Sequence, residues 1–277
     1  MHGIEIDAYP AIKRHLETYR SGLEPRPRDW DPKIQGEWPG RKPGPYRWFE
    51  IQDNVAYWEL FEQPKLLYQV IQFHCQYCVD STGLIGNDKT YFIPSTDPFL
   101  VATLNSPVGW SFATKFFGHM KDEALNPAVF KMPDFPIPTP SHAQRGETAE
   151  LVPRLVEITK LEQGGTREIV DWLSADLGID KPGEALSDFS ALDERAFAAE
   201  VKKRLPKKAG GLSPQQVKRL GEVYREYAIP IQNRRAEADK LEARLADLVN
   251  QAYGLTPEEI DLMWRTAPPR MPGKRPV

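Results

Sequence analysis

Apolar positions in the first half of the chain follow short helical and strand-like patterns. Residues 10–23 place four apolar side chains on one helical face, behind Pro10 at the first helical position, where the missing N–H is not needed. Two short buried helices are predicted over residues 100–104 and 108–117, after the helix-starting pair Asp97 and Pro98. Between the helix at 10–23 and the two buried helices lie β-favouring runs bounded by turn residues, at 46–52, 64–71, 73–79 and 90–93.

The second half of the chain has a helical period throughout. Ser213 and Gln216 form a capping box with Pro214 between them, and Thr256 with Glu259 forms another. An apolar stripe precedes a glycine that stands at a helix C-cap position, Gly254; the stripe consists of Leu241, Leu245, Leu248, Val249 and Ala252.

These patterns predict an α+β fold with two domains. Residues 1–142 form a mixed α/β domain with a twisted sheet, and the proline-rich segment 135–140 closes it. Residues 143–277 form an all-helical domain with a long helix pair, kinked or restarted at Pro230, and a helical insertion over 166–205.

Composition narrows the class of protein. The 277 residues are 40% apolar and 27% charged, as in a soluble chain that builds a core. No stretch approaches the roughly 18 apolar residues of a membrane span, and the start of the chain lacks a secretory signal. With two cysteines there is no disulfide framework, so we expect a cytoplasmic protein without a membrane partner. The net charge of −3 excludes attraction by bulk charge, so nucleic acid would have to bind at locally clustered cations.

The signatures of phosphate loops, zinc proteases and serine hydrolases are absent from the sequence, which therefore predicts no catalytic residue and no cofactor in this chain. The alternative is an acid–base site formed by His74, Asp80 and His119, if the fold brings them together. Cys75 and Cys78 form a single Cys-x-x-Cys pair, and a structural zinc site needs four ligands, so no metal is predicted.

Cationic residues cluster in two stretches. Residues 20–47 hold seven Lys or Arg against four acidic residues, among tryptophans, and Arg41, Lys42 and Arg47 are the candidates for phosphate contacts. Residues 201–240 hold eleven Lys or Arg against four Asp or Glu. Each stretch is either a surface that faces DNA or a solvated one.

A third segment combines amide, hydroxyl, imidazole and charged side chains. Gln and Asn pair with adenine, Lys with guanine, and Asp accepts from cytosine, so such a set can read base edges. Polar residues also alternate with apolar ones along strands whose polar face is exposed to solvent, and such a sheet is the competing interpretation. The candidates are Gln69, Gln72, His74, Gln76, Asp80, Ser81, Thr82, Asn87 and Lys89.

Six short strings resemble, in order and spacing, the C-terminal target-recognition part of Eco57I-like and TaqI-like DNA adenine methyltransferases of bacterial restriction–modification systems. They are YPAIKRHL at 9–16, PYRWFE at 45–50, PKLLY at 64–68, TLNS at 103–106, FPIP at 135–138 and YGLTPEEI at 253–260.

In such enzymes a methyltransferase domain precedes this region and carries an Asn-Pro-Pro-Tyr motif and a pocket for S-adenosylmethionine. Neither motif is in this sequence, so the resemblance implies the recognition half alone: a sequence-specific module for double-stranded DNA. It would work with a methyltransferase catalytic domain in cis or in trans, with or without an endonuclease. The resemblance places the base-reading side chains between residues 64 and 94, whereas Asn105 and Ser106 shape the fold.

A second hypothesis is a protein-interaction or specificity subunit. The long helix over residues 214–252 would then dock on a separate methyltransferase or nuclease. A large exposed apolar stripe on that helix would favour it.

Overall fold

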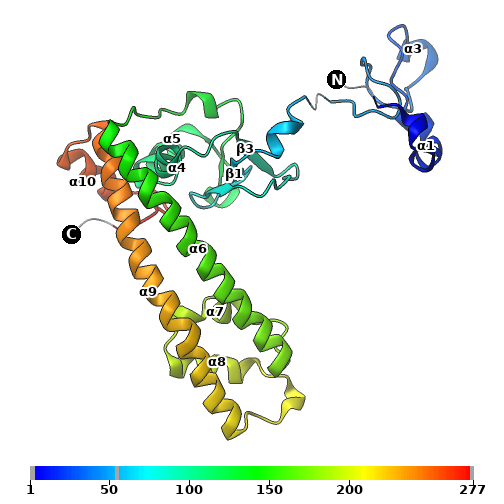
Figure 1. Cartoon of the computed structure of the whole chain (residues 1–277). Helices are drawn as coiled ribbons and strands as arrows, with labels where there is room; N and C mark the ends of the chain where they lie inside the picture. Colours follow the sequence, from blue (N-terminus) through cyan, green and yellow to red (C-terminus); the bar gives the residue numbers. More distant parts are fainter. Residues whose placement is uncertain (1–3, 54–55, 275–277) are drawn as a thin grey trace. The chain divides into compact units, whose positions relative to one another are not determined.

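The computed structural model describes residues 4–53 and 56–274. The chain forms two compact units, which are described separately here (Figure 1). Met1–Gln63 with Thr82–Leu84 form the N-terminal unit, and Pro64–Ser81 with Ile85–Val277 form the main unit. The predicted α+β class is confirmed: a small antiparallel sheet precedes an all-helical C-terminal part.

Short helices and turns make up the described part of the N-terminal unit. The helix predicted over residues 10–23 is interrupted, giving α1 (Pro10–Glu17) and α2 (Arg20–Leu23). Helix α1 ends because the N–H and the hydroxyl of Thr18 both bond to the His15 carbonyl. The other regular elements described in this unit are η1 (Ile6–Ala8), α3 (Pro32–Gln35) and η2 (Trp58–Phe61).

The strand predicted over residues 46–52 is not formed; these residues, all of them described, make turns and bends. The Arg41 guanidinium donates hydrogen bonds to backbone carbonyls that, in a strand, would pair with a neighbouring strand. Its Nη1 donates to the Glu50 carbonyl and its Nη2 to the Trp48 carbonyl, at 2.7 and 2.8 Å.

The sheet of the main unit has three antiparallel strands in the order β2-β1-β3. They are β1 (Lys65–Gln69), β2 (Tyr77–Asp80) and β3 (Thr90–Ile93). Side chains alternate between the two faces of a sheet, and partners in register share a face. Leu66 and Tyr68 of β1 share one face with their partners on β2 and β3, and this face packs into a hydrophobic core.

The strand predicted over residues 73–79 begins only at Tyr77. The preceding segment leaves β1 because its groups pair elsewhere. Gln72 exchanges two backbone hydrogen bonds of 2.9 and 2.8 Å with Leu125 of β5 (Leu125–Asn126), which pairs with β4 (Gly118–His119). The Cys75 thiol donates to the Leu104 carbonyl.

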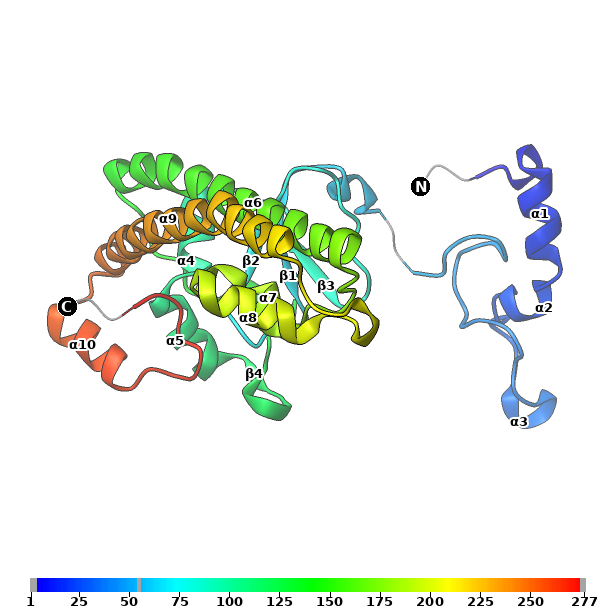
Figure 2. The same ribbon diagram turned by 90° about the horizontal axis from the view of Figure 1, so that it is seen from below.

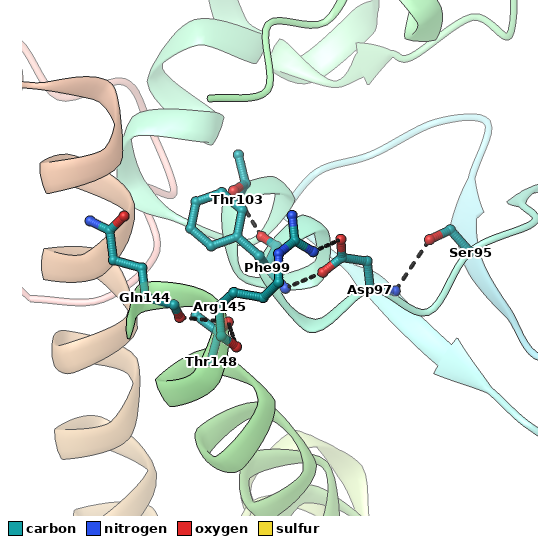
Figure 3. A network of polar contacts seen from close by, with 7 residues as sticks. All are labelled: Ser95, Asp97, Phe99, Thr103, Gln144, Arg145 and Thr148. Carbon is teal, nitrogen blue, oxygen red and sulfur yellow. Dashed lines mark hydrogen bonds and ion pairs between the residues drawn. The ribbon is translucent and has the colours of Figure 1, made fainter. Parts of the chain in front are cut away.

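The two predicted buried helices are confirmed as α4 (Pro98–Leu104) and α5 (Pro107–Phe116). Figure 3 shows how α4 is joined to the long helix α6 (His142–Leu177). The Asp97 carboxylate accepts from the Phe99 N–H and forms an ion pair with Arg145, both at 2.9 Å, so one side chain caps α4 and ties it to α6.

Helix α6 packs antiparallel against α9 (Pro214–Tyr253), and together they form the α6–α9 hairpin (Figures 1 and 2). The Arg154 guanidinium contacts both carboxylate oxygens of Glu237 at 2.7 and 3.0 Å. Arg244 makes the same kind of pair with Glu147. These pairs fix the register of the two helices.

The helical insertion begins at residue 178, later than predicted, because α6 continues to Leu177. It contains α7 (Gly183–Ser187), η5 (Phe189–Ala191), α8 (Glu194–Arg204) and η6 (Lys207–Ala209). Figure 2 shows α7 and α8 on one side of the hairpin. Both predicted capping boxes are confirmed, at the starts of α9 and of α10 (Pro257–Arg265), and Gly254 ends α9 with a φ of 70°.

Helix α9 runs through Pro230 as one element, so of the predicted kink or restart the restart does not occur. Proline removes one backbone hydrogen bond from a helix interior. On either side of it Ala228 and Ile231 are almost completely buried, and their packing holds the helix together across the gap.

Two hydrophobic cores lie along the α6–α9 hairpin. The sheet core joins the sheet, α4 and α5 to Val152 of α6 and to Leu245 and Val249 of α9. The distal core joins the far half of each long helix to α7, η5 and α8. The sheet core therefore crosses residue 142, and the structure divides the chain near residue 63 instead.

Candidate nucleic-acid interface

Three strand ends meet at one end of the sheet. Because β1 runs antiparallel to both neighbours, its last residue lies beside the first residues of β2 and β3. Gln69 is the register partner of Thr90, the Val70 N–H donates to the Lys89 carbonyl at 3.0 Å, and Gln76 precedes the first residue of β2. We call this surface, which comprises residues 69–76 and 85–90, the loop end.

Five of the predicted base-reading residues are exposed at the loop end. Their carboxamide, imidazole and ammonium groups are the ones that form hydrogen bonds with base edges in the major groove. They come from all three strand ends, so one rigid sheet positions them together. They are Gln69, His74, Gln76, Asn87 and Lys89.

The turn before β3 is ordered by its own side chains. The Asn87 carboxamide oxygen accepts from the Lys89 N–H at 2.9 Å. The Lys89 ammonium lies 2.8 Å from the Asp88 carboxylate, and this hydrogen bond raises the pKa of Lys89 above its usual value. Both side chains are exposed, and an exposed pair of this kind is worth little, so Lys89 can exchange Asp88 for a phosphate or a guanine.

Sequence reasoning missed two members of the loop end. Phe73 and Ile71 are apolar yet exposed, at 41% and 38%. The guanidinium carbon of Arg270 lies 5.2 Å from the centre of the Phe73 ring, in the geometry of a cation–π contact. Arg270 comes from the far C-terminal segment, so no local pattern in the sequence could have indicated it.

Gln72 and Asp80, both predicted to read bases, are buried, at 2% and 5% exposure. The Asp80 carboxylate forms an ion pair of 2.6 Å with the equally buried Lys65 on the neighbouring strand. Gln72 is held beside Leu125 by the backbone bridge between them. The structure corrects the expectation for both residues, because neither side chain reaches a base edge in this fold.

The N-terminal unit contains the three cations predicted to contact phosphates, Arg41, Lys42 and Arg47, and their roles differ. Arg41 donates to backbone carbonyls through all three guanidinium nitrogens, which is a structural role in place of the predicted phosphate contact. Lys42 and Arg47 are exposed, paired with Asp53 at 2.6 Å and Glu50 at 2.9 Å. These two cations stay candidates for phosphate contacts.

Ser81 and Thr82 are exposed but lie elsewhere. Ser81 follows the last residue of β2, at the opposite end of the sheet from the loop end. Thr82 belongs to the N-terminal unit. Within the main unit, the predicted contact residues therefore lie at both ends of the sheet and not at the loop end alone.

The alternative acid–base site is not assembled. Asp80 is buried at the end of β2 opposite the loop end, whereas His74 is exposed on it. The His119 ring contacts the Thr114 carbonyl and Glu123.

The two cysteines are not arranged as metal ligands. Burial raises the pKa of the thiols of Cys75 and Cys78, which disfavours thiolate formation. Across the described residues no three His, Cys, Asp or Glu side chains lie close enough to hold a metal ion.

The apolar stripe on α9 is mostly covered by the chain itself. Leu245, Leu248 and Val249 are buried, and Leu241 and Ala252 are half-buried. These five side chains of the stripe therefore pack wholly or partly within the main unit. None of the described helices combines the length and the apolar character that a membrane span requires.

Comparison with known proteins gave one family match. The model of a domain of unknown function (DUF8810) matches residues 141–249. The match runs from the N-cap of α6 into the last turns of α9, so it coincides with the α6–α9 hairpin and its insertion. No curated protein and no solved structure matched the chain.

Proposed function

We propose that this chain is the DNA target-recognition module of an adenine-N6 methyltransferase of the restriction–modification type. The catalytic domain, with its S-adenosylmethionine, is supplied in cis or in trans. The observation that carries the proposal is the loop end, where exposed amide, imidazole and ammonium groups from three strand ends stand beside exposed apolar side chains.

The chemistry of the loop end fits the major groove of duplex DNA. A Gln carboxamide forms two hydrogen bonds with the N6 and N7 of adenine, and a Lys ammonium donates to the O6 and N7 of guanine. Gln69 and Gln76 supply the first contact and Lys89 the second. Ile71 and Phe73 offer apolar surface to thymine methyl groups.

Recognition of this kind supports base flipping. A methyltransferase must rotate its target adenine out of the stack, at a cost of a few kcal/mol. Each correct bidentate contact is worth about 1–3 kcal/mol of discrimination. In this proposal the loop end forms hydrogen bonds with the bases that flank the target adenine. Lys42 and Arg47 contact phosphates, which carry no sequence information.

The test is selection from a pool of random duplexes by the purified chain, followed by sequencing. The wild type is expected to enrich one motif, with affinity that falls steeply as salt rises. Gln76→Ala and Lys89→Ala are each expected to relax the preference at one base pair, with a loss of about 1–3 kcal/mol at that position.

Matched controls are available on α6. Gln163 and Lys160 are exposed there, far along the chain from the loop end, so Gln163→Ala and Lys160→Ala are expected to leave the enriched motif unchanged. If the wild type enriches no motif, or if its affinity is indifferent to salt, the proposal is overturned.

A further inference from the structure

The structure divides the basic stretch 201–240 into neutralised and free cations. Five of its eleven Lys or Arg side chains are paired with carboxylates: Lys203 and Arg204 with Glu200, Arg219 with Glu222, Arg225 with Glu194, and Arg235 with Glu162 and Asp188. Four of the remaining six lie between residues 202 and 218. The free charge is therefore concentrated in one place.

We call residues 202–219 the hairpin tip. It holds the last turn of α8, η6, and the first turns of α9, and it contains seven Lys or Arg and no Asp or Glu. Lys202, Lys207, Lys208 and Lys218 are all exposed, and no described carboxylate pairs with any of them. The N-terminus of α9 points its positive dipole end into the same region.

The backbone of the hairpin tip is anchored although its lysines are free. Val201 and Leu220, at its two borders, are buried in the distal core, and Leu205 and Leu212 pack against that core. Apolar residues on both sides of the lysines are thus packed in the distal core, while the four lysine side chains are exposed.

The hairpin tip lies at the end of the main unit away from the sheet (Figure 1). Leu245, where α9 joins the sheet core, follows Lys218 by about 27 residues, which is roughly 40 Å at the rise of an α-helix. One helical turn of B-DNA is about 34–36 Å long. The hairpin tip therefore lies about one helical turn of duplex from the point where α9 joins the sheet core.

We propose that the hairpin tip is a second binding site for the phosphate backbone of the same duplex, about one helical turn from the bases that the loop end reads. This inference rests on the proposed function. The chemistry of the site is that of sequence-independent contact: lysine ammonium groups act as point charges on phosphates and carry no base code.

The tip is expected to extend the length of DNA that the chain requires. A duplex of about 12 base pairs reaches only the loop end, whereas one of about 30 base pairs reaches both sites. Binding to the longer duplex should release more counterions, because each added phosphate contact steepens the dependence of log K on log salt by about 0.9.

The experiment measures duplex affinity of the full chain against salt, with 12- and 30-base-pair duplexes centred on the selected motif. The variant Lys207→Gln/Lys208→Gln is compared with Lys160→Gln/Lys240→Gln, which removes two exposed lysines from the body of the hairpin. The tip variant is expected to lower the salt slope on the long duplex by about two, and to leave the slope on the short duplex unchanged. Circular dichroism melting checks that both variants are folded.

Three results would overturn the inference while leaving the proposed function intact: an unchanged slope for the tip variant on the long duplex, an equal loss in the control variant, or an equal loss on both duplexes. Binding of the wild type to vesicles of phosphatidylserine, lost in the tip variant while the long-duplex slope is unchanged, would assign the tip to a membrane surface instead. Failure of the wild type to bind either duplex overturns both proposals.

Discussion

Lys65 and Asp80 form an ion pair across β1 and β2 with 2.6 Å between Nζ and Oδ2, and their side chains are 0% and 4% exposed. Removing one partner of such a pair leaves a buried charge without compensation, which costs about 3–5 kcal/mol. We therefore expect Asp80→Ala to lower the free energy of unfolding by this amount, as measured by urea denaturation.

The double variant Lys65→Met/Asp80→Leu is the control, because it removes both charges and keeps apolar volume at the site. It is expected to recover most of the lost stability. A single variant as stable as the wild type, with altered base preference instead, would restore Asp80 to the recognition surface and contradict the structural role.

Arg41 provides a second prediction for a single residue. Its three guanidinium nitrogens donate to the carbonyls of Leu23, Trp48 and Glu50, at 2.7 to 2.8 Å. A lysine cannot reproduce this fork of donors, so Arg41→Lys and Arg41→Ala should both loosen the segment around residues 41–50. Hydrogen exchange measured by mass spectrometry is expected to show faster exchange there.

The adjacent Lys42 is the matched control, since it is exposed and its pair with Asp53 is exposed too. Lys42→Ala should leave exchange in this segment as in the wild type. Equal effects of the two substitutions would show that the carbonyl contacts of Arg41 do not hold the segment.

The residue scale also shows what local pattern can and cannot predict. The residues between positions 69 and 90 illustrate this: Gln69 is exposed and Gln72 is buried, and the strand predicted over 73–79 begins only at Tyr77. The difference arises because Leu125, from a distant hairpin, pairs with Gln72. A partner that far along the chain leaves no trace in the spacing of nearby residues.

At the scale of elements, the ion pairs between α6 and α9 make stability depend on pH. Hydrogen bonds from Arg244 and Arg154 hold the pKa values of Glu147 and Glu237 below the usual 4.5. A carboxylate with a lowered folded pKa contributes stability above its usual pKa, and this stability is lost as pH falls through the folded pKa. Thermal melting should therefore show a loss of stability as the pH falls below the usual pKa of 4.5.

The variant Glu147→Gln/Glu237→Gln is expected to melt with a weaker dependence on pH over the same range, because two of the titrating groups are gone. High salt should reduce the difference between the variant and the wild type, since these pairs are exposed. An identical pH profile for both proteins would mean that the pairs do not stabilise the hairpin.

The helix ends that carry a capping signal were predicted correctly, because such signals are local. The capping boxes at Ser213 and Thr256 and the glycine at 254 each act within four residues, and all three hold. At Pro230 the predicted restart does not occur, because the packing of Ala228 and Ile231 in the distal core holds the helix together across the proline. The strand predicted over 46–52 does not form because the Arg41 side chain, from outside the segment, donates hydrogen bonds to its backbone carbonyls.

At the scale of the whole chain, the change of composition near residue 142 marks a change of secondary structure and not a limit of packing. Val152, Leu245 and Val249 complete the core under the sheet, and the Trp110 indole donates to the Pro269 carbonyl at 3.0 Å. Composition along the sequence reports which elements form, whereas the boundary of a compact unit depends on which elements meet. That second question is decided by long-range contacts.

The last prediction follows from this shared core. A fragment of residues 1–142 lacks the apolar side chains that α6 and α9 contribute to the sheet core, and it exposes Leu66, Phe99 and Trp110, which are buried in the full chain. We expect it to melt without a cooperative transition and to bind a hydrophobic dye. A fragment of residues 143–277 keeps all of the distal core and should retain a cooperative helical transition by circular dichroism. Mixing the two fragments should restore a cooperative transition to the fragment of residues 1–142. If that fragment melts cooperatively alone, its sheet needs no partner from the hairpin.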